Sequence, residues 1–64
     1  MHLTRDQIAD LRSKSPQGIY QAIRDLVREE HGVVDRDELA EALEDAEESG
    51  LLDRSEIRRF EDEG

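Results

Sequence analysis

Residues 29–39 read EEHGVVDRDEL, and residues 47–57 read EESGLLDRSEI. The two stretches lie eighteen positions apart and share the pattern G-Φ-Φ-D-R-x-E-Φ, in which Φ is an apolar residue. Glycine readily adopts the left-handed backbone conformation that ends many helices. An aspartate followed three residues later by a glutamate is typical of the start of the next helix, where carboxylates accept hydrogen bonds from free backbone N–H groups. The repeat therefore predicts two helix–corner–helix junctions.

Each position of the repeat has a structural role in this interpretation. The glycines that end a helix are Gly32 and Gly50. The apolar residue after each glycine should fold back onto the helix just ended, so we expect two partly buried residues at the corners, Val33 and Leu51. The predicted cap pairs are Asp35 with Glu38 and Asp53 with Glu56. Residues 3–8, LTRDQI, repeat the same helix start with Thr4 and Gln7.

The spacing of apolar residues predicts helices along the whole chain. Ile19, Ile23 and Val27 draw one apolar stripe down residues 16–31, and Pro16 suits a first helical position. No segment alternates apolar and polar residues as a half-buried strand would. We therefore predict an all-α fold, a small single domain over residues 1–64 with four short helices at about 4–13, 16–31, 36–49 and 54–62.

The inner faces of these helices supply the predicted core. It consists of Leu3, Ile8, Leu11, Ile19, Tyr20, Ile23, Leu26, Val27, Val34, Leu39, Leu43, Leu52, Ile57 and Phe60. The helix over 36–49 has a thin apolar stripe with two alanines, Ala42 and Ala46, so it should lie close to its neighbour. The stability that a core can supply in a chain of 64 residues is marginal. Self-association is therefore one way in which the fold could gain stability.

Composition narrows the class of protein. The chain has no cysteine, which excludes disulfides and thiolate metal sites. No apolar run approaches the roughly 18 residues that cross a membrane, and the first residues lack a signal-like stretch, so we expect a cytoplasmic protein. Both histidines have simple interpretations: His2 lies near the chain end, and His31 lies where a helix dipole favours a protonated ring. No carboxylate pair can be assigned to an enclosed pocket, so we expect no catalysis and no cofactor.

The net charge of −9 is unevenly distributed. Residues 1–31 carry five basic and five acidic side chains, whereas residues 32–64 carry four basic and thirteen acidic ones. Eight of the basic residues are arginines and one is a lysine, Lys14, a halophilic type of composition in which charge favours solubility. A salt-rich cytoplasm and a binding face are thus two open explanations of the acidity.

The binding-face explanation concerns the helix over residues 36–49. Its polar side is almost entirely acidic and comprises Asp37, Glu38, Glu41, Glu44, Asp45 and Glu48. Such a face either serves solubility or docks a basic partner. Our preferred hypothesis is a non-enzymatic protein–protein interaction module in which this face binds an unknown, basic protein partner.

A helix-turn-helix-type nucleic-acid-binding protein is the main alternative. Short helices with a tight corner suit that motif, and the last helix carries the only basic cluster, Arg54, Arg58 and Arg59. Binding to duplex DNA depends largely on neutralising phosphates, which the acidic helix would oppose. We therefore favour the protein-binding hypothesis over direct nucleic-acid binding.

Residues 45–56, DAEESGLLDRSE, resemble the twelve-residue loop of the EF-hand family. Oxygen-bearing side chains stand at loop positions one, three, five, nine and twelve, with glycine at six: Asp45, Glu47, Ser49, Asp53, Glu56 and Gly50. The resemblance implies calcium coordination by these side chains. The first repeat, aligned in the same way, starts at Val27 and has His31 at position five, so it lacks ligands. Helix capping predicts both repeats and calcium only one, so we expect no metal site.

Overall fold

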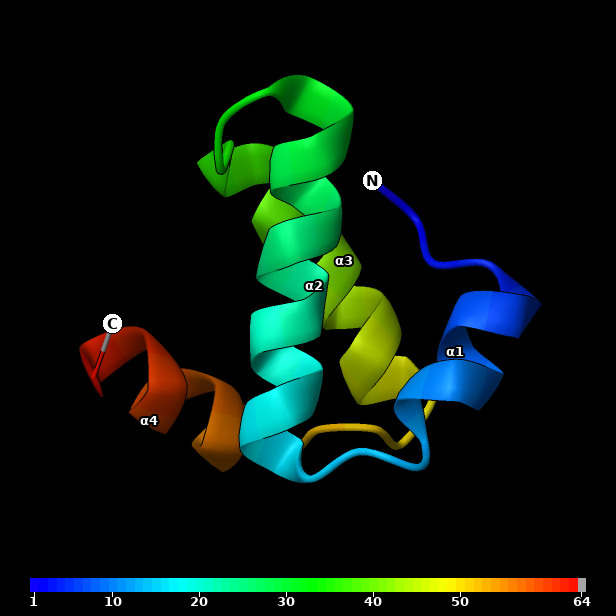
Figure 1. Cartoon of the computed structure of the whole chain (residues 1–64). Coiled ribbons are helices and arrows are strands. Elements are labelled where there is room, and N and C mark those ends of the chain that lie inside the picture. The colour runs from blue at the N-terminus through cyan, green and yellow to red at the C-terminus, as the bar shows by residue number, and fades with distance from the viewer. Residues whose placement is uncertain (64) are drawn as a thin grey trace.

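Four helices follow one another in the computed structural model, which describes residues 1–63 (Figure 1). They are α1 (Arg5–Leu11), α2 (Pro16–His31), α3 (Arg36–Glu48) and α4 (Arg54–Glu63). Residues 1–63 contain no strand. The all-α fold predicted from the sequence is therefore confirmed.

Helix α1 ends two residues earlier than the sequence predicted. The Ser13 hydroxyl donates to the Asp10 carbonyl at 2.9 Å, and the Lys14 N–H donates to the Leu11 carbonyl at 3.0 Å. Serine side chains compete with the helical backbone in this way. Ser13 and Lys14 therefore form a turn that leads to Ser15, whose hydroxyl accepts from the Gly18 N–H at the start of α2.

Helix α2 is the central element, and α3 and α4 both pack against it rather than closely against each other (Figure 1). Its buried stripe consists of Ile19, Tyr20, Ile23 and Val27, as the spacing predicted. Ala42 and Ala46 of α3 are completely buried, which lets α3 approach α2 closely. The other members of the core are Leu11, Leu43, Leu51, Leu52 and Phe60.

Six residues of the predicted core are only partly buried. Four of them pack against the core from its edge: Leu3, Ile8, Leu39 and Ile57. Leu26 and Val34 are also only half-buried. Leu3 and Val34 lie in the segments that precede α1 and α3, and the other four residues lie on helices. A domain with four short helices leaves such positions at the rim of its core.

The two corners differ, and the prediction for Val33 is wrong: its exposed fraction is 66%. Both corner glycines have positive φ, 78° at Gly32 and 77° at Gly50. At the second corner the Leu51 N–H donates to the Ala46 carbonyl at 2.9 Å, the bond of a Schellman motif. At the first corner the Gly32 N–H donates to the Arg28 carbonyl, which is the bond of the simpler left-handed (αL) capping motif. In that motif the apolar contact with the helix is not made by the residue that follows the glycine. Leu51 is consequently buried and Val33 is not.

The predicted helix starts are confirmed, with one change. Thr4 with Gln7 and Asp53 with Glu56 each exchange two hydrogen bonds between side chain and backbone. Asp35 also caps α3, since its carboxylate accepts from the N–H groups of Asp37 and Glu38 at 2.9 and 3.3 Å. The Glu38 side chain does not return to the Asp35 backbone. It contacts the N-terminus of the chain instead.

Candidate functional site

Helix α3 carries most of the excess negative charge. Its thirteen residues include seven acidic side chains and one basic one, a net charge of −6 out of −9 for the chain. The helical repeat divides the six predicted site residues into two rows. One row, the inner row, faces the N-terminal segment and consists of Glu38, Glu41 and Asp45. The other, the outer ridge, consists of Asp37, Glu44 and Glu48, all exposed.

Residues 1–3 lie against the inner row. The α-amino group of Met1 donates to the Glu38 carboxylate and, at 3.0 Å, to that of Glu41. The Leu3 N–H donates to Asp45 Oδ2 at 3.0 Å. Positive charge and backbone donors of the chain itself therefore occupy the inner row.

The His2 ring adds to this contact. Its Nδ1 lies 3.0 Å from Asp45 Oδ2, and its Nε2 faces the Glu41 carboxylate. His2 therefore has a structural role that the sequence did not reveal.

The contact between the N-terminus and Glu38 shifts both groups toward their charged forms. The hydrogen bond from the α-amino group lowers the pKa of the Glu38 carboxyl. The same bond raises the pKa of the Met1 α-amino group, against the opposing effect of desolvation. His31 lies 3.6 Å from the Glu38 carboxylate and contributes further positive charge when its ring is protonated.

The carboxylates of the outer ridge have no comparable positive partners. Within residues 1–63, none of its three carboxylates lies within 4.0 Å of a basic group. The structure thus separates the predicted acidic face into a row engaged by the chain itself and a ridge of exposed carboxylates.

The arginines of the nucleic-acid alternative are exposed on α4 but interleaved with carboxylates. Arg54 lies 3.8 Å from Glu47, and Arg59 lies 3.8 Å from Glu63. Arg58 lines a shallow depression between α3 and α4 together with acidic side chains. The three arginines therefore do not form a continuous basic surface.

The stretch that resembles an EF-hand loop adopts a different structure. Its first four residues, 45–48, belong to α3 instead of a loop, and Asp45 accepts from Leu3. Asp53 and Glu56 form the cap of α4 with each other. Across residues 1–63, no group of three or more His, Cys, Asp or Glu side chains is arranged to hold a metal ion.

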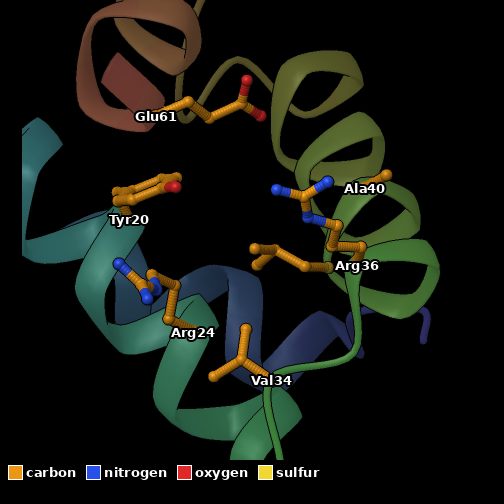
Figure 2. Close-up of a pocket in the computed structure, with 7 residues that line it drawn as sticks. Tyr20, Arg24, Val34, Arg36, Ala40 and Glu61 are labelled. Atoms are coloured by element: carbon orange, nitrogen blue, oxygen red, sulfur yellow. The ribbon is translucent and has the colours of Figure 1, made fainter. Parts of the chain in front are cut away.

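A groove that the sequence did not reveal lies over α2, between α3 and α4 (Figure 2). We call it the arginine-rimmed groove; it has a volume of about 560 Å³ and is lined by Tyr20, Arg24, Val34, Arg36, Leu39, Ala40 and Glu61. It exists because both α3 and α4 pack on α2 and diverge from each other. No pattern along one helix could have predicted this, since the lining comes from three helices and a corner.

Comparison with models of protein families, with curated proteins and with solved structures finds no match. None of the helices within residues 1–63 combines the length and apolar character needed to span a membrane.

Proposed function

We propose that this protein is a non-enzymatic protein–protein interaction module that binds a basic surface of its partner through the outer ridge of α3. The observation that supports this most is the concentration of six net negative charges on one helix of thirteen residues, with the outer ridge free of intramolecular ion pairs in the described part of the chain. A cytoplasmic location is part of the proposal.

The neighbouring inner row supports the kind of partner proposed. There, α3 carboxylates already receive an α-amino group and backbone or ring donors from residues 1–3. A basic partner would supply comparable donors to the outer ridge, which lies on the same rigid helix. Because the ridge is exposed, its attraction for a basic surface should weaken as salt screens the charges.

A pull-down from cell extract tests the proposal. The bait proteins are the wild type, an Asp37→Asn/Glu48→Gln variant, and a Glu30→Gln/Asp62→Asn control. The control removes the same amount of charge from exposed sites on α2 and α4. We expect the ridge variant to lose a partner that the wild type and the control retain, and raised salt to release it. Equal recovery by all three baits would reject the outer ridge as the binding surface.

A further inference from the structure

We propose that the arginine-rimmed groove binds an acidic peptide segment of a partner protein in which an apolar side chain stands next to a glutamate or aspartate. This interaction goes beyond the proposed function, because it uses a different surface of the protein and takes a ligand of opposite charge.

The first argument is the presence of two guanidinium groups at the groove. Arg24 comes from α2 and Arg36 from the first turn of α3, and both side chains border the hollow in Figure 2. Neither lies within 4.0 Å of a carboxylate of the described residues. Guanidinium groups form paired, charge-assisted hydrogen bonds with carboxylates. The groove thus offers two carboxylate-binding groups on facing sides of the hollow, neither of them paired with a carboxylate of the described residues (Figure 2).

The groove also holds the Arg24 guanidinium group in place. The Arg24 guanidinium carbon lies 5.9 Å from the centre of the Tyr20 ring, a cation–π distance. The Tyr20 ring itself packs against Phe60 with 5.5 Å between ring centres. Burial raises the pKa of the Tyr20 hydroxyl, so the hydroxyl stays neutral. The Arg24 guanidinium therefore packs against a buried ring, which restricts its motion and lowers the entropic cost of binding a carboxylate.

The second argument is the apolar floor between the charged groups. Val34 and Leu39 are half-buried and leave apolar surface exposed in the groove, and Ala40 is too small to fill it. A ligand that carried only charge would leave this surface in contact with water. An apolar side chain next to the carboxylate would cover it.

Size and the remaining charge specify the ligand further. The volume of about 560 Å³ falls within the range of about 300–1,000 Å³ typical of ligand pockets, but the groove is partly open to solvent. An extended peptide suits an open groove better than a small molecule that needs enclosure. Glu61 on α4 points into the groove opposite Arg36, so a peptide backbone N–H, rather than a second carboxylate, should lie at that side.

Peptide titration followed by ¹⁵N–¹H NMR of the labelled protein tests this inference. The probe is an N-acetylated, C-amidated hexapeptide of alternating glutamate and leucine. Three matched probes replace the glutamates by glutamine, the glutamates by lysine, or the leucines by serine. We expect only the glutamate–leucine peptide to give saturable shifts, centred on the amides of Arg24, Arg36, Ala40 and Glu61. Equal binding of the glutamine probe, or shifts centred elsewhere, would overturn the inference.

Matched variants distinguish binding at the groove from non-specific attraction of the peptide to positive charge. Arg24→Gln/Arg36→Gln should weaken binding of the glutamate–leucine peptide at least tenfold, and Arg36→Gln alone should weaken it by a smaller factor. Arg5→Gln/Arg28→Gln removes two exposed arginines outside the groove and should leave binding unchanged. Equal loss in the control would contradict a site at the groove. Sedimentation that shows dimers of the wild type, abolished in Arg24→Gln/Arg36→Gln, would instead make a second copy of this chain the occupant.

Discussion

Leu51 is 8% exposed and Val33 is 66% exposed, although the two residues follow the glycine at equivalent positions of a repeated corner. The Leu51 N–H reaches back to the Ala46 carbonyl, whereas the first corner is closed by the Gly32 N–H on Arg28. The backbone bond decides whether the next side chain turns toward the core. One sequence pattern thus produces two different corners.

Truncation of the two side chains should therefore have unequal effects. Leu51→Ala should lower the free energy of unfolding by about 2–4 kcal/mol, because it removes buried apolar volume. Val33→Ala should change it by no more than about 0.5 kcal/mol, as is usual for exposed positions. Urea unfolding followed by circular dichroism measures both. Similar losses in the two variants would contradict the difference between the corners.

Substitution of a corner glycine should destabilise the fold because of the backbone conformation at that position. A Cβ added at Gly50 would meet no atom within 4 Å, so only the positive φ of 77° opposes it. Gly50→Val should cost about 1–2 kcal/mol, the cost of a left-handed conformation. Gly50→Asn should cost less, because asparagine visits this conformation more readily. Thermal unfolding of the two variants makes the comparison, and equal melting temperatures would refute the interpretation.

The cap of α4 gives a third prediction. Asp53 Oδ1 accepts from the Glu56 N–H at 2.8 Å, and Glu56 Oε1 accepts from the Asp53 N–H at 3.1 Å. Asp53→Ala should lower the free energy of unfolding by about 1 kcal/mol, whereas Asp53→Asn keeps an acceptor and should lose little. Chemical denaturation checks both variants. If Asn proved as damaging as Ala, the capping hydrogen bond would not be the source of the stability.

The contact of residues 1–3 with α3 should depend on pH at both ends. The lowered pKa of Glu38 means that its contribution is present above the carboxyl's unfolded pKa of about 4.3 and is lost as pH falls through the folded value. The raised pKa of the Met1 α-amino group means that its contribution is present below about pH 8 and is lost as pH rises through the folded value. The contact should therefore be strongest between about pH 5 and pH 8.

Hydrogen exchange of the Leu3 amide, which donates to Asp45, measures this contact directly. After correction for the intrinsic pH dependence of exchange, protection should be greatest in the middle of that range. N-terminal acetylation removes the α-amino charge and should abolish the loss at high pH. Equal protection across the whole range would show that the α-amino group does not hold the segment.

Local patterns predicted the helices because their signals are local. Thr4, Asp35 and Asp53 cap helices through residues two or three positions away, and a single stripe on α2 forms the centre of the core. The exposure of Val33 depends on which of two backbone hydrogen bonds closes the corner. The sequence pattern that the two corners share does not distinguish these bonds.

The candidate sites were predictable only in part. The acidity of α3 is visible in its composition, but its division into two rows depends on where residues 1–3 lie in space. The arginine-rimmed groove arises from the divergence of two helices that both pack on a third. Contacts between distant segments leave no periodic signal along the chain.

The central claim is that the outer ridge of α3 is the surface that meets a basic partner. The most direct measurement is a ¹⁵N–¹H NMR titration of the labelled protein with the partner recovered in the pull-down. We predict shifts concentrated at the amides of Asp37, Glu44 and Glu48 that disappear at high salt. Shifts concentrated instead on the α4 arginines, Arg54, Arg58 and Arg59, would contradict the claim.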